Sequence, residues 1–194
     1  MRVVDTELVG YTGRFQPFHM DHLEMVHTAL GLAQRVVIGV TNPDPTMLHR
    51  HAASAHRHLP DANPFTYEER SAMITAALAT DSVSPERVRI VPFPLESAAD
   101  WPSLLPPGTP QLVRVFSDWE REKVRRFDGA GYPAIVLEGN PLTRISGTEI
   151  RRRLACDEPW EQWVPPGARE LVARFYSRIH AKYGEQRTAA NDPG

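Results

Sequence analysis

The sequence predicts a single α/β domain whose helices cover a doubly wound parallel sheet. Three observations lead to this fold class. Short apolar runs alternate along the chain with segments that carry apolar residues at helical spacing, as in α/β proteins. Four of the five apolar runs are rich in Val or Ile, as buried parallel strands tend to be. The length of 194 residues suits one domain with a well-formed hydrophobic core.

The predicted elements follow one another in a regular order. The strands are expected at residues 8–12, 35–40, 88–92, 112–116 and 134–137. The helices are expected at residues 22–33, 66–78, 119–127, 147–155 and 166–182. In this interpretation residues 1–184 form the domain, and residues 185–194 form a polar tail that frays. Ligands of such Rossmann-like sheets bind beyond the carboxyl ends of the strands.

The composition excludes several classes of protein. The formal net charge is −2, so the bulk charge does not indicate a nucleic-acid-binding protein. The single cysteine, Cys156, excludes a disulfide framework and a zinc site built from cysteines. No apolar stretch reaches the roughly 18 residues of a membrane span, and residues 1–5 lack the pattern of a signal peptide. We expect a cytoplasmic protein that binds neither nucleic acid nor membrane, and we leave open whether it forms a homo-oligomer.

A motif directly after the first predicted strand indicates a phosphate site. Residues 13–22 read Gly-Arg-Phe-Gln-Pro-Phe-His-Met-Asp-His. His19 and His22 stand three residues apart at a helix start, so that both imidazoles face one small volume. The helix N-terminus adds unpaired N–H groups and partial positive charge, and Gly13 lets the backbone pass close to a ligand. The alternative is a pair of histidines that only cap the helix.

A second motif lies far downstream and opens another predicted helix. Ser146 and Glu149 have the spacing of a capping box. The same helix start can also bind a phosphate, with Ser146 and Thr148 as additional donors. Three arginines follow at residues 151–153, and cations in the first turns weaken a helix unless an anion is bound nearby. This conflict favours a functional role. At helical spacing the three arginines cannot all face one ligand, so that some of them are expected at the surface.

Together the motifs resemble a family of nucleotidyltransferases. The first motif, the segment 63–70 that reads Asn-Pro-Phe-Thr-Tyr-Glu-Glu-Arg, and the Ser-x-Thr-x-Ile-Arg element of the second motif occur in this order and cover most of the chain. They resemble the HxGH-type nucleotidyltransferases, above all the nicotinamide-mononucleotide (NMN) adenylyltransferases of archaeal type. The resemblance implies transfer of a nucleotidyl group from an NTP–Mg²⁺ complex to a small phosphate or phosphonate acceptor, with release of pyrophosphate.

The resemblance also implies roles for particular residues. Catalysis is expected of His19, His22, Arg14 and Arg151. NTP binding is expected of Gly13, Phe15, Gln16, Phe18, Ser146, Gly147 and Thr148. Such a transfer depends on fixed cations and Mg²⁺ rather than on a general base, because the acceptor is already an oxyanion. Mg²⁺ is therefore the expected cofactor, and no side chain is assigned to it as a ligand.

Three short segments depart from the archaeal adenylyltransferase pattern. Asp21 stands where the pair between the two histidines ends in Gly, and we interpret it as the N-cap of the helix. Ser117 and Asp118 occupy the place of a Ser-Gly-Asn segment after the fourth strand. Trp101 is present, but the Asn that would read a nicotinamide amide is not near it. We expect Trp101, Ser117 and Asp118 to contact the acceptor.

The fourth departure is the long segment 42–63, which carries Arg50, Arg57 and four histidines. It can be a lid or binding loop, a disordered surface excursion, or a zinc site built from its two His-Arg-His triplets. We assign Arg50 and Arg57 to the acceptor, because guanidinium groups pair well with phosphonate and carboxylate oxygens.

All four departures concern the acceptor side or the lip of the site. They resemble a branch of natural-product enzymes that transfer CMP from CTP to small phosphonates, and we expect a CTP-dependent cytidylyltransferase. One alternative is an adenylyltransferase that makes NAD from ATP and NMN. The other is a module that senses nucleotides without turnover.

Overall fold

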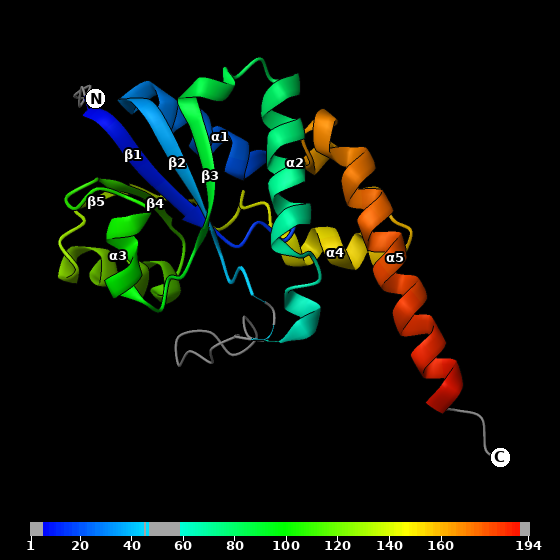
Figure 1. Ribbon diagram of the computed structural model, residues 1–194. Coiled ribbons are helices and arrows are strands. Elements are labelled where there is room, and N and C mark those ends of the chain that lie inside the picture. Colours follow the sequence, from blue (N-terminus) through cyan, green and yellow to red (C-terminus); the bar gives the residue numbers. More distant parts are fainter. Residues whose placement is uncertain (1–5, 45, 47–58, 191–194) are drawn as a thin grey trace.

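The computed structural model describes residues 6–44, 46 and 59–190, with side chains as far as residue 178. All five predicted strands are present, with bounds that differ by a few residues. They are β1 (Thr6–Gly13), β2 (Ala33–Thr41), β3 (Val88–Phe93), β4 (Gln111–Val115) and β5 (Ala134–Glu138). The strands form one sheet in the order β3-β2-β1-β4-β5, and every neighbouring pair is parallel (Figure 1). The predicted doubly wound α/β fold is confirmed.

The five predicted helices are present as well. They are α1 (Met20–Leu32), α2 (Tyr67–Thr80), α3 (Asp118–Gly129), α4 (Gly147–Ala155) and α5 (Pro166–Ala190). Short 3₁₀ turns stand between them, namely η1 (Pro60–Ala62), η2 (Pro85–Arg87), η3 (Ala98–Ser103) and η4 (Glu161–Trp163). The helix α5 continues past the predicted end at residue 182, because the segment after Gly184 is rich in good helix formers such as Ala, Glu, Gln and Arg.

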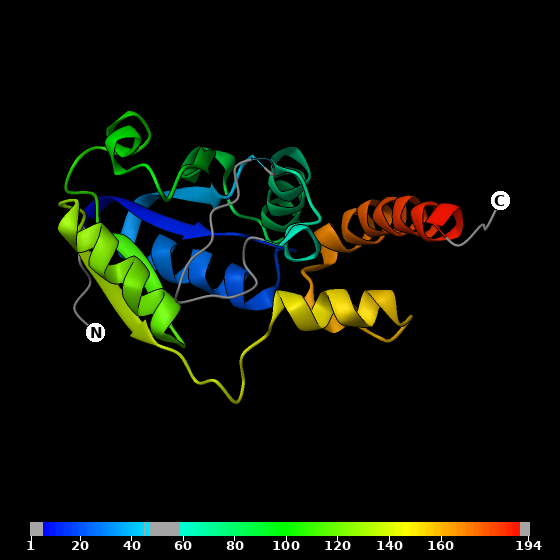
Figure 2. The same cartoon turned by 90° about the horizontal axis from the view of Figure 1, so that it is seen from below.

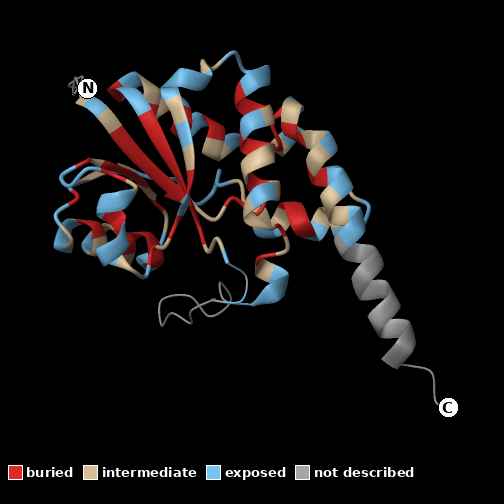
Figure 3. Cartoon of the chain, viewed as in Figure 1, coloured by how far each residue is buried: buried red, intermediate tan, exposed pale blue. Residues whose placement is uncertain are grey.

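The sheet separates two hydrophobic cores, as the alternation of side chains along β2 shows. Val36, Ile38 and Val40 belong to the larger core, which includes buried residues of α1, α2, α4 and α5. Val37 points to the opposite face and belongs to the smaller core, which includes Trp101 of η3 and buried residues of α3. In Figure 3 the central strands carry most of the buried strand residues, whereas the helices bury one side and expose the other.

The strand order places the chain's topological switch between β1 and β4. After β1 the chain builds outward to β2 and β3, and it then returns to the other side of β1 for β4 and β5. The segments that follow β1 and β4 therefore diverge, and this leaves a crevice at their carboxyl ends. The helix α5 packs along α2 and runs away from the sheet (Figures 1 and 2). No helix in the described part of the chain is both long and apolar enough to cross a membrane.

Candidate active site

A cavity of about 530 Å³ lies at this switch point. Four segments provide most of its lining: β1 with the turn after it, the first turns of α1, β4 with the start of α3, and the loop before α4 with α4 itself. Ala62 of η1 completes it. Most of the predicted site residues meet here, namely Gly13, Arg14, Phe15, Gln16, His19, His22, Ser117, Ser146, Gly147, Thr148 and Arg151. The fold thus brings the first and second motifs, which lie far apart in the sequence, to one pocket.

The two histidines form a stacked pair at the start of α1. Their ring centroids lie 3.5 Å apart, with an interplanar angle of 23°. Burial and the nearby Arg144 lower the pKa of His19 to about 3. Burial, followed by the neighbouring His19, also holds the pKa of His22 well below its ordinary value. Both imidazoles are therefore neutral at physiological pH.

Backbone contacts fix the tautomer of one ring. The backbone N–H of His19 donates to Nδ1 of His22 at 3.2 Å. A neutral His22 that accepts at Nδ1 carries its proton on Nε2, which makes Nε2 a donor. Nδ1 of His19 is buried and has no hydrogen-bond partner among the described residues. The Nε2–H of His22 can donate to an oxyanion. The buried Nδ1 of His19 requires a polar ligand or a water molecule as its partner.

The segment 63–70 acts as a support for the first motif. The buried Arg70 donates to the carbonyl oxygens of Arg14, Thr41 and Asn42 at 2.9, 2.7 and 2.8 Å. These bonds hold the end of β2 and the turn after β1, where Phe15 has a φ of 53° and Asn42 a φ of 50°. Arg70 therefore stabilises a backbone with positive φ, which residues other than glycine rarely adopt.

Gln16 and Arg14 make further bonds to this support. Both polar atoms of the Gln16 amide pair with the backbone of Phe65 at 3.0 Å. Arg14 donates to the carbonyl oxygen of Ala62 at 3.2 Å and to Oδ1 of Asn63 at 3.4 Å. The side chain of Gln16 therefore holds the turn in place, and both polar atoms of its amide are engaged there.

The structure corrects the interpretation of Asp21 as an N-cap. The cap residue of α1 is His19, so that Asp21 stands inside the first turn of the helix. Its Oδ2 accepts the backbone N–H of Ile145 at 2.9 Å, in the loop before α4. Burial raises the pKa of Asp21, against the opposing effect of this hydrogen bond. Asp21 thus links the two motifs instead of capping its own helix.

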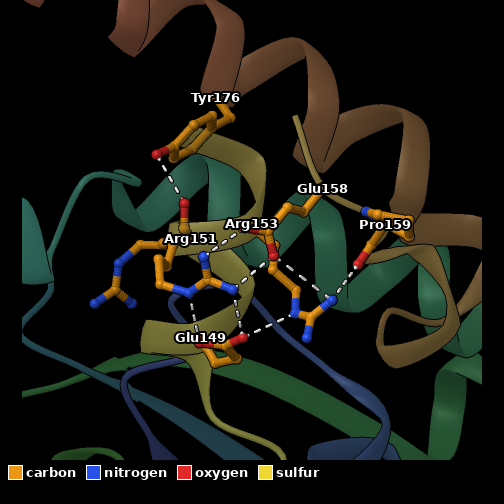
Figure 4. A network of polar contacts seen from close by, with 7 residues as sticks. Glu149, Arg151, Arg153, Glu158, Pro159 and Tyr176 are labelled. Carbon is orange, nitrogen blue, oxygen red and sulfur yellow. Dashed lines mark hydrogen bonds and ion pairs between the residues drawn. The ribbon is translucent and has the colours of Figure 1, made fainter. Parts of the chain in front are cut away.

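The predicted capping box of α4 is wrong as well. Ser146 is the N-cap but makes no side-chain cap bond. Glu149 is held by the guanidinium groups of Arg152 and Arg153, which hydrogen-bond its carboxylate and lower its pKa to about 2. Two charged donors one turn away compete successfully with a single backbone N–H. In Figure 4 these groups and Glu158 form one cluster of charges.

Arg151 stands apart from that cluster, and its guanidinium points away from it (Figure 4). It is 8% exposed and donates to the carbonyl oxygen of Gln16 and, at 3.3 Å, to Oγ1 of Thr148. Its own carbonyl oxygen accepts the hydroxyl of Tyr176 at 3.0 Å. Arg151 therefore lines the pocket and holds α4 against the turn after β1.

Three predicted residues do not line the pocket. Trp101 is 1% exposed in the smaller core, where its Nε1 donates to the carbonyl oxygen of Pro94 at 2.9 Å. Phe18 is fully buried in the larger core. Asp118 is exposed at the first position of α3. The phenyl ring of Phe18 and the indole ring of Trp101 are buried in the two cores, which lie on opposite faces of the sheet.

The remaining acceptor residues, Arg50 and Arg57, and the four histidines of segment 42–63 lie outside the described residues. The zinc alternative for that segment falls outside them as well. Ser117 lines the pocket, and its hydroxyl donates to Oε2 of Glu120 at 2.6 Å.

Sequence reasoning missed three cations of the pocket. Arg114 of β4 lines it and donates to the carboxylate of Glu24 at 3.0 and 2.9 Å. Lys123 is 8% exposed, and its Nζ donates to the carbonyl oxygen of Thr12. The signal was its spacing, because Trp119, Lys123 and Phe127 form an i, i+4, i+8 row on the buried side of α3. Arg144 lies over the ring of Phe116 at 4.5 Å and carried no such signal, because its place depends on a loop.

The pocket has a strongly positive lining. Five cationic side chains and two carboxylates face it, although the whole chain carries a net charge of −2. The cations are Arg14, Arg114, Lys123, Arg144 and Arg151, and the carboxylates are Asp21 and Glu120. Such a pocket at the switch point of a doubly wound sheet is suited to a polyphosphate and a second small anion.

The family comparison agrees with this site. Residues 10–153 match the family model described as cytidylyltransferase-like, and the chain belongs to this family of nucleotidyltransferases. It is 37% identical over 160 residues to a phosphonoformate cytidylyltransferase of Streptomyces viridochromogenes, with 82% of this chain and 87% of the relative covered. It is 33% identical over 176 residues to a nicotinamide-nucleotide adenylyltransferase of Methanospirillum hungatei, with 88% and 91% covered.

A solved structure shares the fold. A bifunctional NMN adenylyltransferase/ADP ribose pyrophosphatase from Francisella tularensis superposes with a TM-score of 0.66 at 18% identity. The superposition covers 97% of this chain and 58% of that longer protein. The sequence-based prediction of a nucleotidyltransferase is confirmed, and because the curated relatives are enzymes, the alternative of a module without turnover is set aside.

Proposed function

We propose that this enzyme transfers CMP from CTP to a small phosphonate and releases pyrophosphate. The observation that carries the proposal is the 37% identity to a phosphonoformate cytidylyltransferase over most of both chains. The pocket supports it, because its lining is rich in cations, as two anionic substrates require.

In the proposed reaction an oxygen of the acceptor phosphonate attacks the α-phosphorus of CTP. A new P–O bond forms while the bond from the α-phosphorus to the bridging oxygen breaks, and that electron pair leaves with pyrophosphate. The nucleophile is already an anion, so that no side chain has to remove a proton. The contribution of the protein is then positioning and stabilisation of the charge on the phosphate oxygens.

The described side chains divide this work between two helix starts. At α1, the Nε2–H of His22 and the guanidinium of Arg14 donate to the oxygens of the α-phosphate. At α4, Ser146, Thr148 and the helix N-terminus receive the leaving pyrophosphate. The motifs and their position in one pocket support this division.

Mg²⁺ enters this proposal as part of the CTP substrate. Among the residues that the structure describes, no three His, Cys, Asp or Glu side chains gather to hold a metal ion. Mg²⁺ in such enzymes is commonly bound through substrate phosphates, and a solved relative of the same fold contains AMP and a Mn ion. We expect excess EDTA to abolish pyrophosphate release and added Mg²⁺ to restore it. Full activity in the chelator would contradict this part.

On the acceptor side we retain Ser117, Arg50 and Arg57. The last two lie outside the described residues and are proposed from the sequence, because guanidinium groups bind phosphonate and carboxylate oxygens in pairs. We expect Arg57→Ala to raise the KM for the acceptor and to leave the KM for CTP unchanged.

The decisive experiment measures pyrophosphate release with the four NTPs, each combined with phosphonoformate, other small phosphonates or NMN. We expect CTP with a small phosphonate to give the highest kcat/KM. The second candidate is NMN adenylyl transfer, which the 33% identity to an archaeal adenylyltransferase favours. A much higher kcat/KM for ATP with NMN would overturn the proposal and establish that candidate.

A further inference from the structure

The link between Asp21 and Ile145 joins the two motifs at one hydrogen bond. Asp21 stands at the second position of α1, one residue before His22. Ile145 directly precedes Ser146, which is the N-cap of α4. The carboxylate Oδ2 accepts the Ile145 N–H at 2.9 Å, and both residues line the pocket. The two helix starts that face the substrates are thus held to each other across the pocket.

The other polar contacts of this loop do not fix its position relative to α1. Arg144 lies over Phe116 at 4.5 Å and faces Glu120 at 3.6 Å, which fixes the side of the loop toward α3. Arg151 bonds the carbonyl oxygen of Gln16 and fixes α4 one turn further on. Among the hydrogen bonds of the described residues, only the bond from Ile145 to Asp21 joins this loop to the α1 helix itself.

We propose that Asp21 is a positioning residue that sets the start of α4 against the start of α1 for nucleotidyl transfer. The proposal rests on nucleotidyl transfer in this pocket but not on the choice of acceptor. In-line displacement requires the α-phosphate at one helix start and the leaving pyrophosphate at the other to keep a fixed separation. An error of about 1 Å in such a geometry can cost about 100-fold in rate.

The charge of Asp21 beside a polyphosphate site is balanced by its surroundings. The partial positive charge at the N-terminus of α1 favours a carboxylate in the first turn. Arg114 of β4 and Arg144 of the loop face it from the other elements, and Glu24 of α1 opposes them. The carboxylate can therefore stay close to the phosphates and act through the loop rather than on the substrate.

The test compares Asp21→Ala, Asp21→Asn and the control Glu68→Ala. Asn keeps an oxygen that accepts the Ile145 N–H. Glu68 is an exposed carboxylate at the second position of α2. Its replacement by Ala also removes a negative charge from the first turn of a helix, but at a site away from the pocket. Steady-state kinetics use the NTP and acceptor pair that is best for the wild-type enzyme. Amide hydrogen exchange at Ile145, read by NMR, reports the bond itself.

We expect Asp21→Ala to lower kcat by about 10-fold to 100-fold with little change in KM and to speed the exchange of the Ile145 amide. Asp21→Asn is expected to retain kcat within about threefold and to keep that amide protected, and Glu68→Ala should match the wild type in both. An unchanged kcat in Asp21→Ala, an amide that stays protected in it, or an equal loss in Asp21→Asn would overturn the proposal.

A failure of the proposed function gives a different pattern. If the wild-type enzyme released no pyrophosphate from any pair, CTP affinity by calorimetry would replace kcat as the readout. Weaker CTP binding with faster Ile145 exchange in Asp21→Ala, both restored in Asp21→Asn, would still support positioning. Equal affinity in all three variants would overturn it.

Discussion

At the scale of single residues, the site depends on two imidazoles that burial keeps neutral. A neutral His22 with Nδ1 bonded to the backbone presents an N–H, and burial favours this neutral form. This suits a reaction that needs donors for phosphate oxygens and no proton transfer. The positive charge of the pocket comes instead from its four arginines and Lys123.

We expect His22→Ala to lower kcat by about 100-fold or more, because a donor to the transition state is lost. His19→Ala should behave in the same way. The folded state is expected to survive both changes, which circular dichroism and the thermal midpoint would report. Near-wild-type turnover in both variants would exclude a phosphate contact.

The buried histidine also makes stability depend on pH. The pKa of His19 is about 3 in the folded protein against an ordinary value of 6.5. Between these values the unfolded chain binds a proton that the folded protein does not, so that stability is lost as the pH falls below about 6.5. We expect His19→Gln to have a shallower decline of Tm from about pH 7 to about pH 4.5. Parallel Tm curves for the variant and the wild type would contradict this.

At the scale of elements, the start of α4 lies directly against the turn after β1. A Cβ on Gly147 would stand 2.6 Å from the carbonyl oxygen of Gln16, a backbone atom that cannot rotate away. We expect Gly147→Ala to move α4 outward and to lower kcat by more than about 10-fold. The matched control is Gly31→Ala in α1, where a Cβ meets nothing within 4 Å.

Gly31→Ala should leave kcat unchanged and raise stability by about 0.4–1 kcal/mol, because alanine has less freedom in the unfolded chain. Equal kcat values for the two variants would show that the contact between α4 and the turn is dispensable.

The elements themselves followed from the sequence, and the site followed in part. The strand runs and the motif at the end of β1 are local signals, because apolar periodicity and a helix start are properties of neighbouring residues. The links of Asp21 to Ile145 and of Lys123 to Thr12 join distant segments, and they depend on loop paths and on how α3 meets the sheet. The prediction that Trp101 contacts the acceptor was wrong, because the position of a Trp in the sequence does not determine which side of a loop its indole ring packs against.

At the scale of the whole molecule, the two cores lie on opposite faces of one sheet and support different helices. The larger core holds the helices that present the phosphate site, and the smaller core holds α3 and η3 beneath the crevice. Trp101 packs there against Phe93, Phe127 and Tyr132, with ring centroids 5.4, 5.1 and 5.6 Å away.

We expect Trp101→Ala to cost about 3–5 kcal/mol of unfolding free energy, as for other large core residues. Trp101→Phe should cost much less and leave the KM for both substrates unchanged. Denaturant unfolding and steady-state kinetics measure the two effects. A raised acceptor KM in the stable Phe variant would return Trp101 to the acceptor site.

The way Arg70 and Arg14 bind the chain has a consequence for changes in the segment between their backbone partners. Arg70 bonds the carbonyl oxygen of Asn42, and Arg14 bonds that of Ala62, so that the ends of the segment between them are pinned beside the pocket. With both ends fixed, doubling the number of residues between them adds only about 0.6 kcal/mol of closure entropy. Insertions, deletions and substitutions in this stretch are therefore expected to cost little folding stability.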